Sequence, residues 1–318
     1  MPVKSEHTYP EKIVIGTRGS PLALWQANHV KDLLAKISSS TTVELRVINT
    51  SGDWRPSDGE VRLEALEGGK AQFAKELEEA LLAGHIDMAV HSMKDMETVL
   101  PDGLVIPCIL PREDARDAFI SHTAKTLDDL PKGARIGTAS IRRQAFVLHK
   151  RPDLKVEVLR GNVETRLDKL RNGQVDATFL AVAGLKRLGL EGRIASIMPE
   201  DDMLPSVAQG AIGIEIRSED EKKMSFINQL NCPDTFMCVS CERAVLRALS
   251  GSCHTPVGVR ARISGDALDL QVKVISPDGG QAWEESARIE GASLARAELL
   301  GENIGKRLKR SVPAGVLG

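Results

Sequence analysis

The sequence has no long hydrophobic run, and nowhere do its apolar residues approach the roughly 20 in succession that cross a bilayer. Its opening segment, MPVKSEHTYPEK, carries charges and is followed by no apolar stretch of the kind that a secretory signal contains. A disulfide framework is not expected either, because the five cysteines are an odd number in a chain without such a signal. We therefore expect a short disordered lead-in, reduced thiols, no membrane partner and a cytoplasmic location.

A strong excess of one charge is missing as well. The 42 Lys and Arg residues nearly balance the 44 Asp and Glu residues, which leaves a formal net charge of −2. Nucleic acid is therefore not an expected partner, and any anion-binding site must be local. With 318 residues, of which 42% are hydrophobic and 27% charged, the chain has the size and composition of a globular protein of two or three domains.

Short apolar runs and helix caps alternate along the first two thirds of the chain. Ser20 before Pro21 is a typical helix cap, and the apolar runs on either side of this helix predict a parallel βαβ unit. The pattern restarts after the polar connection at 111–114, where Ser140 and Asn162 cap two further helices. The expected strands are 13–15, 43–47, 86–90, 135–137, 156–159 and 175–183, and another helix covers 72–83. Two α/β lobes around a cleft follow from this pattern.

The last third of the chain has a different pattern. A helix at 236–249 precedes three alternating strands and a final helix, and turn residues separate the strands. We expect a small α+β C-terminal domain with a three-stranded antiparallel sheet, built from strands 257–263, 268–275 and 282–289 and a helix at 292–309.

The densest positive charge lies between Arg135 and Arg171, where ten Lys or Arg residues face four Asp or Glu residues. Arg142 and Arg143 fall in the first turn of a helix, where a cation opposes the helix dipole, and Arg160 ends a strand just before a helix cap. Arginines beside helix N-termini form sites for several carboxylates or for phosphate. A solvated helix face is the alternative, and the residues alone leave the choice of anion open.

Lys94 and Asp95 follow the strand at 86–90, in the place where open α/β folds put their sites. A carboxylate beside a cation can stabilise a developing positive charge or move a proton. An ordinary surface loop is the alternative for such a pair. We expect His91 to be a packed structural histidine.

The C-x-x-C pair and one loop cysteine suggest chemistry. Cys238 and Cys241 form a C-x-x-C pair, but they have helical spacing and no matching second pair, so buried thiols are expected rather than zinc. Cys253 differs, because its loop between a helix and a strand places it beside His254. An exposed thiol there can be a nucleophile or a covalent anchor, and a plain free cysteine is equally compatible with the sequence.

Two further segments that precede helices are weaker candidates for anion binding. Lys70 follows two glycines, although the full phosphate-loop pattern is absent. Arg18 and Ser20 lie in the first turn between a strand and a helix, where free backbone amides attract anions.

Six segments of the chain match motifs of one family. They are GTRGSPLALWQA at 16–27, AVHSMKD at 89–95, SIRRQ at 140–144, RGNVETRL at 160–167, LAVAGLKRLG at 180–189 and the loop around Cys253. Together, over about residues 12–300, they closely resemble the porphobilinogen deaminase (hydroxymethylbilane synthase) family. The resemblance implies two lobes like those of a periplasmic binding protein, with the chain returning to the first lobe. The implied parts are 1–112 with 211–229, 113–210 and 230–318.

The resemblance also implies an activity. It is that of a monomeric transferase of haem biosynthesis that condenses four porphobilinogen molecules head to tail, with loss of four ammonia. The rings grow on a dipyrromethane primer held by a thioether, and hydrolysis then releases linear hydroxymethylbilane; no metal is needed.

Family motifs assign roles to individual positions of this chain. Asp95 and Lys94 become catalytic. The cofactor residues become Cys253, Arg142, Arg143, Ser140, Lys94, Asp95, Thr138 and Asn162. The substrate residues become Arg18, Ser20, Arg160, Arg166, Arg187, Lys70 and Phe73, of which Lys70 and Phe73 belong to a mobile lid.

A non-catalytic, bilobal anion-binding protein is the competing hypothesis. It explains two lobes and the arginines, but it gives no reason for Cys253 or for a third domain.

Overall fold

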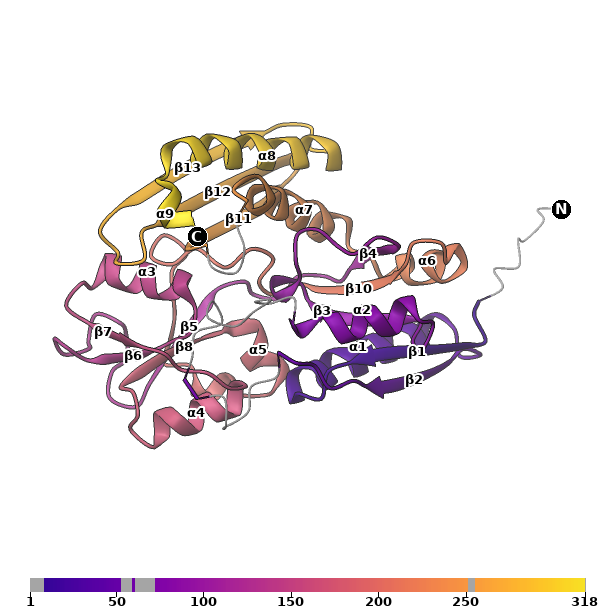
Figure 1. Ribbon diagram of the computed structural model, residues 1–318, viewed down its shortest axis with the longest axis horizontal. Coiled ribbons are helices and arrows are strands. Elements are labelled where there is room, and N and C mark those ends of the chain that lie inside the picture. The colour runs from indigo at the N-terminus through magenta and orange to yellow at the C-terminus, as the bar shows by residue number, and fades with distance from the viewer. Residues whose placement is uncertain (1–8, 53–58, 61–71, 251–254, 318) are drawn as a thin grey trace.

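The computed structural model describes residues 9–52, 59–60, 72–250 and 255–317. These residues form two α/β lobes and a smaller C-terminal part that lies beside both (Figure 1). The expected fold class is therefore confirmed, because each lobe has its own five-stranded sheet and the C-terminal part has a three-stranded one.

The first lobe has the strand order β2-β1-β3-β10-β4. β1 pairs in parallel with β2 and β3, whereas β10 runs antiparallel to both β3 and β4. The predicted cap is present, since the Ser20 side chain accepts a hydrogen bond from the Ala23 amide. The strands are β1 (Lys12–Thr17), β2 (Thr42–Val47), β3 (Met88–Ser92), β4 (Leu104–Ile109) and β10 (Ile212–Arg217). The helices are α1 (Pro21–Ile37), α2 (Lys75–Leu82), α6 (Glu221–Ile227) and the 3-10 turns η4 (Met93–Asp95) and η6 (Asn228–Leu230).

The second lobe repeats this plan with the order β7-β6-β8-β5-β9. Three strands are parallel, and β5 is antiparallel to β8 and β9. Ser140 and Asn162 cap their helices as expected, by accepting hydrogen bonds from the amides three residues on. The strands are β5 (Asp117–Ser121), β6 (Arg135–Gly137), β7 (Lys155–Glu157), β8 (Ala177–Ala181) and β9 (Ser196–Ile197). The helices are α3 (Ile141–Lys150), α4 (Val163–Arg171), α5 (Val182–Arg187) and the turn η5 (Glu191–Arg193).

The bounds of several predicted elements were wrong. The expected strand at 175–183 ends at Ala181, where α5 begins, because a continuous apolar run does not reveal a change from strand to helix. The strand at 156–159 is 155–157, so Arg160 lies beyond the strand rather than at its end. β4, β5, β9 and α9 were not predicted.

The C-terminal part packs two helices against one face of its sheet. All three strands are antiparallel, in the order β11-β12-β13. α7 and α8 approach closely at two glycines: a Cβ at Gly301 would lie 2.2 Å from the Cys241 carbonyl oxygen, and one at Gly305 would lie 2.6 Å from that of Val245. The elements are α7 (Pro233–Ala248), β11 (Val257–Ser264), β12 (Ala267–Ile275), β13 (Ala282–Ile289), α8 (Leu294–Ser311) and α9 (Ala314–Leu317).

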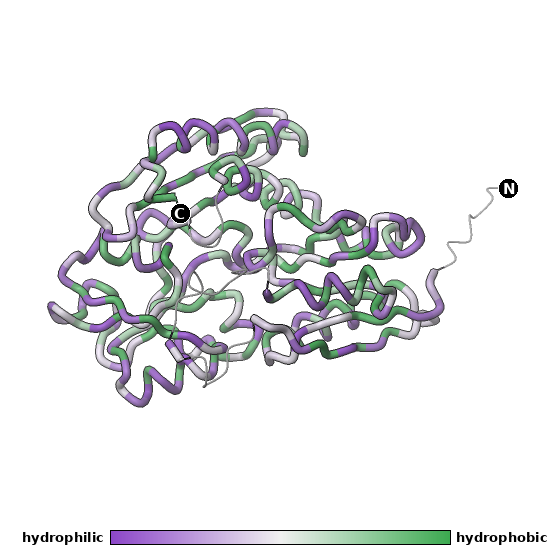
Figure 2. The backbone as a smooth tube through the Cα atoms, viewed as in Figure 1, coloured by the Kyte–Doolittle hydropathy of each residue, from purple (hydrophilic) through white to green (hydrophobic). Residues whose placement is uncertain are grey.

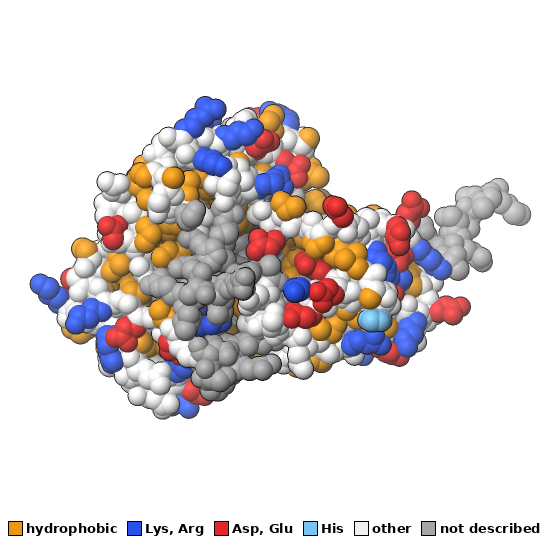
Figure 3. Space-filling model, viewed as in Figure 1, with side chains coloured by type: hydrophobic (Ala, Val, Ile, Leu, Met, Phe, Trp, Pro, Cys, Tyr) orange, Lys and Arg blue, Asp and Glu red, His pale blue; other side chains and the backbone are white. Residues whose placement is uncertain are grey.

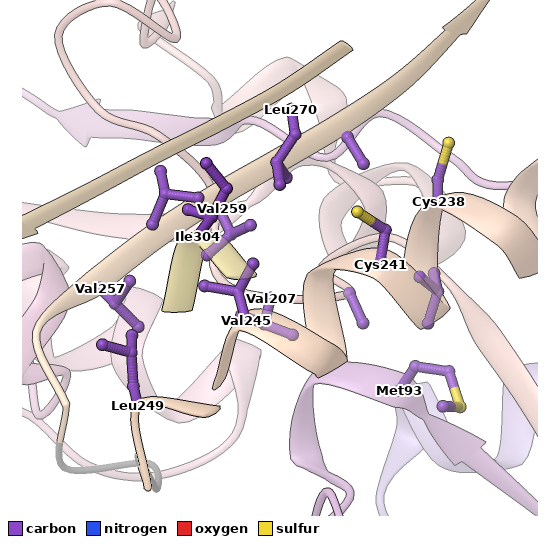
Figure 4. Packing of buried hydrophobic residues seen from close by; sticks show 14 of the residues in the cluster. Met93, Val207, Cys238, Cys241, Val245, Leu249, Val257, Val259, Leu270 and Ile304 are labelled. Carbon is purple, nitrogen blue, oxygen red and sulfur yellow. The ribbon is translucent and has the colours of Figure 1, made fainter. Parts of the chain in front are cut away.

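One hydrophobic core joins this part to the first lobe. Met93 and Met96, which flank Lys94 and Asp95, are buried in the same cluster as the inward side chains of α7 and β11. Figure 4 shows Met93 below α7, the helix that carries Cys238 and Cys241. The position of the Asp95 turn is therefore set by packing between two parts of the fold.

Glu242 of α7 links the two chain crossings between the lobes. Its buried carboxylate forms an ion pair with Arg112 on the first crossing, with N···O distances of 2.6 and 3.0 Å. It also accepts hydrogen bonds from the amides of Ala208 on the second crossing and of Ala261 on β11. The crossings are thus held against the C-terminal part by one side chain.

Hydrophilic and hydrophobic stretches alternate along the outer helix α8 (Figure 2), as its single packed face requires. On the face shown in Figure 3, acidic and basic side chains are intermixed, in keeping with the small net charge. Within the described residues, no helix combines the length and apolarity that a membrane span needs.

Candidate active site

Two cavities meet at the Asp95 turn. The larger lies between the lobes and the C-terminal part, with an empty volume of about 1020 Å³ that includes open solvent. The smaller, of about 460 Å³, lies on the first lobe. Asp95 and Met96 line both of them. The larger cavity is also lined by Lys94, Ser140, Arg142, Arg143, Arg166 and Arg243, and the smaller by Arg18, Ser20, Gln26, Phe73, His91 and Ser92.

A hydrogen bond and side-chain packing, both made by Met93, hold the Asp95 turn in place. The Met93 amide donates to the Ala211 carbonyl of the returning chain, and Gly213 on β10 leaves room for the methionine, since a Cβ there would lie 2.1 Å from its Sδ. The Asp95 carboxylate accepts no hydrogen bond from any residue that the structure describes. It is therefore available to a ligand.

Arg142 and Arg143 share one counter-ion that the sequence did not suggest. Asp117 of β5 is fully buried and lies 2.7 Å from a terminal nitrogen of each guanidinium. Burial alone would raise the pKa of Asp117, but the two guanidiniums outweigh it and hold this pKa below its usual range. Arg142 and Arg143 also donate to the carbonyls of Leu204 and Phe179. One carboxylate thus fixes both arginines at the start of α3 and leaves a net positive charge.

Gln209 connects this group to the first lobe. Its Nε2 atom donates to Asp117 at 3.1 Å and to the Ala115 carbonyl, while its Oε1 atom accepts from Lys94 at 3.5 Å. The chain crossing that carries Gln209 therefore links the Asp95 turn of one lobe to the arginine pair of the other.

Arg166 lies on α4 within electrostatic range of Asp95. Desolvation, reinforced by the positive charge of Arg143, lowers the pKa of Arg166 to about 10, so it remains charged at neutral pH. Its Nε atom donates to the Gly161 carbonyl, and Arg166 also lines the larger cavity.

Arg160 is buried but lines neither cavity. Its backbone amide donates to Glu60, which also pairs with Lys169 of α4. The Nη1 atom is buried and has no hydrogen-bond partner among the residues described. A buried guanidinium nitrogen in this state is a candidate for an anionic ligand.

Arg18 and Arg187, both expected at the substrate, lie in different places. The Arg18 guanidinium stacks 4.4 Å from the Phe73 ring centroid at the smaller cavity. Arg187 instead donates to the Gly210 carbonyl and lies 5.8 Å from the Trp25 ring centroid, outside both sets of lining residues. Desolvation lowers the pKa of Arg187 to about 10.

The side chains of two other expected cofactor residues form hydrogen bonds with nearby residues of the chain. Thr138 is buried and accepts from the Ser140 amide, and the Asn162 side chain caps α4. Cys253 and Lys70 lie outside the described residues.

The sequence analysis missed Asp117, Gln209 and Arg243. Asp117 is the first residue of β5, and Gln209 lies on the second chain crossing. Arg243 lies on α7, where it donates to the Met96 and Glu97 carbonyls beside the Asp95 turn. Asp117 stood among other charged residues, so composition alone could not single it out. Only the tertiary structure brings Asp117 beside Arg142, Arg143 and Gln209.

The helical cysteines are buried, as expected. Burial is the main cause that raises the pKa of Cys238 to about 11 and that of Cys241 to about 12. Among the described residues, no group of three His, Cys, Asp or Glu side chains could hold a metal ion.

We expect Asp117→Asn to lower the free energy of unfolding by about 3–5 kcal/mol at neutral pH, because two buried guanidiniums lose their counter-ion. The pKa of Asp117 is lower in the folded state than in the unfolded chain. Its contribution is therefore complete above about pH 4 and disappears as the pH falls through the folded-state value. Urea unfolding at neutral and acidic pH should show the difference from the parent shrink in acid. A constant difference would contradict this assignment.

We expect Arg160→Leu to raise the KM for an anionic substrate at least about tenfold while the protein keeps or gains stability. The reason is that the buried Nη1 atom already lacks a partner within the described structure, so folding loses little when it is removed. Arg171→Leu is the control, because Arg171 is an exposed arginine at the end of α4, the helix that follows Arg160. Equal KM values for the two variants would exclude a binding role for Arg160.

Two family models cover most of the chain. One, described as "Porphobilinogen deaminase, dipyromethane cofactor binding domain", matches residues 13–225, and "Porphobilinogen deaminase, C-terminal domain" matches 236–310. The chain belongs to the porphobilinogen deaminase family. A porphobilinogen deaminase of Nitrobacter winogradskyi is 51% identical over 285 residues, which cover 88% of this chain and 89% of that one. A chloroplastic member from Oryza sativa subsp. japonica is 48% identical over 279 residues, covering 86% of this chain and 77% of that one.

Solved structures of two-lobed binding domains are more distant. The periplasmic aliphatic sulphonate binding protein SsuA from Escherichia coli is 16% identical with a TM-score of 0.42, covering 76% of this chain and 71% of that one. The BenM effector binding domain with benzoate is 17% identical with a TM-score of 0.43, covering 70% of this chain and 92% of that one. The fold assignment therefore rests on the strand order of the two lobes.

Membership of the porphobilinogen deaminase family makes the chain an enzyme of tetrapyrrole synthesis. Porphobilinogen is its substrate and dipyrromethane its cofactor.

Proposed function

We propose that the chain is a transferase that joins four porphobilinogen molecules head to tail, with loss of four ammonia, and then releases linear hydroxymethylbilane by hydrolysis. The observation that carries this proposal is that Asp95 lines both cavities. A carboxylate at their junction can face the end of the growing chain in one cavity and the incoming ring in the other. There it stabilises the positive charge that develops on the incoming ring as ammonia leaves.

Dipyrromethane, bound through a thioether to Cys253, supplies the free α-carbon to which the first ring is added. The larger cavity suits its carboxylates, because the Nε atom of Arg142 is buried there without a partner among the described residues. Thr255, two residues after Cys253 in the chain, lines the same cavity. We assign cofactor binding to Lys94, Asp95, Thr138, Ser140, Arg142, Arg143, Asn162 and Cys253.

Porphobilinogen brings one acetate and one propionate group to the smaller cavity. Arg18 at its edge supplies a guanidinium for one of them, and the Ser20 hydroxyl supplies a hydrogen bond. A carboxylate buried without such a partner would cost several kcal/mol. As the chain grows, its further carboxylates need the remaining cations. We assign substrate binding to Arg18, Ser20, Lys70, Phe73, Arg160, Arg166 and Arg187, with Lys94 assisting Asp95 in catalysis.

We propose three domains: 1–112 with 211–229, 113–210, and 230–318. The strand order supports this division, since β10 returns to the first sheet after the whole second sheet is complete. Both crossings contact Glu242 of the third domain, in keeping with boundaries between the lobes at these two segments.

We also propose that the enzyme works as a monomer in the cytoplasm and without nucleic acid. The described cysteines are free thiols, as a reducing compartment requires. The near-balanced net charge argues against a protein whose whole surface attracts nucleic acid.

The decisive experiment supplies the purified protein with porphobilinogen and measures a product that oxidises to uroporphyrin. A binding protein without catalysis would retain porphobilinogen unchanged. Release of four ammonia for each product molecule would establish the stoichiometry, and recovery of intact porphobilinogen would refute the proposal.

A further inference from the structure

A buried histidine–glutamate pair lies beside the smaller cavity. His91 of β3 and Glu215 of β10 lie on neighbouring antiparallel strands, and the His91 Nε2 atom is 2.9 Å from a Glu215 carboxylate oxygen. The Glu215 side chain is 0% exposed and that of His91 is 6% exposed. The second carboxylate oxygen of Glu215 is buried and has no partner among the described residues.

This arrangement orients the imidazole. An ionised carboxylate can only accept hydrogen bonds, so Nε2 is the donor and the neutral ring keeps its lone pair on Nδ1. No described residue forms a hydrogen bond with Nδ1. His91 lines the same cavity as Asp95 and Arg18. The pair therefore has the form of a base held by a carboxylate, as in other acid–base sites.

Charged side chains from neighbouring elements lie around the pair. Glu78 of α2 is an electrostatic neighbour of both His91 and Glu215, and Arg243 of α7 is a positive neighbour of Glu215. Burial, reinforced by Glu215, raises the pKa of Glu78 to about 7. An imidazolium formed at His91 would meet the carboxylate of Glu215 at hydrogen-bond distance.

The reaction requires such a base. Loss of ammonia from the substrate's protonated aminomethyl group leaves a cation, and the free α-carbon of the chain attacks its methylene carbon. One carbon–carbon bond forms, and the α-carbon must then lose its proton to restore the aromatic ring. That proton finally combines with the ammonia released, so each addition yields one ammonium ion.

We propose that His91, oriented by Glu215, is the base that accepts this α-proton. Asp95 then remains ionised throughout, which its role beside the cation demands. This inference rests on the proposed function and adds a second acid–base residue to it.

Porphobilinogen deuterated at its free α-position tests the assignment. We expect His91→Gln to lower kcat by about 10²-fold or more, the usual contribution of a general base, and to reveal an isotope effect that the parent lacks. Proton removal becomes the slow step when the base is missing. Glu215→Gln should show the same isotope effect with a smaller loss, because the amide still accepts the hydrogen bond but no longer stabilises the imidazolium. His85→Gln is the control, since His85 is exposed on the same lobe.

A His91 that only supports the catalytic turn would slow loss of ammonia, and the isotope effect would stay at one. That result, or a loss of less than about threefold in His91→Gln, would overturn the inference while the parent still makes product. If His91→Gln does not fold, as judged by its melting curve, the isotope effect in Glu215→Gln decides. A parent that makes no product would instead refute the proposed function itself.

Discussion

Asp95→Asn should keep its fold and cofactor but lose at least about 10²-fold in kcat. The amide is nearly isosteric with the carboxylate, yet it carries no charge to stabilise a cationic intermediate, and losses of 10²–10³ are usual when one preorganised electrostatic group is removed. The side chain accepts no hydrogen bond within the described structure, and the turn is held by Met93 and Met96 instead. Folding should therefore be little affected.

The measurement is steady-state turnover of porphobilinogen together with intact mass and thermal unfolding. Asp102→Asn provides a control on an exposed position of the same lobe. A loss of less than about tenfold for Asp95→Asn would remove this carboxylate from the central role, whatever the behaviour of the other residues around the two cavities.

Cys253→Ser should abolish activity and yield a protein without a covalent primer. The parent, made in a host that produces porphobilinogen, should carry extra mass equal to two porphobilinogen units less two ammonias, and a thioether keeps that mass after thiol treatment. The variant should also melt at a lower temperature, because a ligand bound only to the folded state stabilises that state. Intact-mass spectrometry and a melting curve measure both effects.

Serine variants at the other cysteines are the matched controls. Burial raises the pKa of Cys108 to about 12, and Cys238 and Cys241 are similarly poor thiolates in the helix α7, so none of them should carry the primer. Cys232→Ser should likewise keep the adduct and the activity. An unmodified parent, or an adduct that maps to one of these cysteines, would contradict the Cys253 assignment.

Local signals in the sequence were enough for much of the fold. Ser20, Ser140 and Asn162 cap their helices because a short polar side chain reaches the free amides of the first turn, whatever the surroundings. The three C-terminal strands alternate and have clear turns, so their pattern was sufficient. Strands β4 and β5 were not predicted, and each pairs with a strand that is distant in the chain.

The candidate site likewise combines features that the sequence predicts with features that only the tertiary structure shows. The sequence by itself determined which residue types are present: a carboxylate beside a lysine, clustered arginines at helix starts, and a loop cysteine in a family pattern. The tertiary structure alone decided that Asp117 binds two of those arginines and that Asp95 lies where two cavities meet. It also paired His91 with Glu215. The physical reason is that caps and periodicity act over a few residues, whereas a buried charge is matched across the fold, by whichever strand or crossing the packing brings beside it.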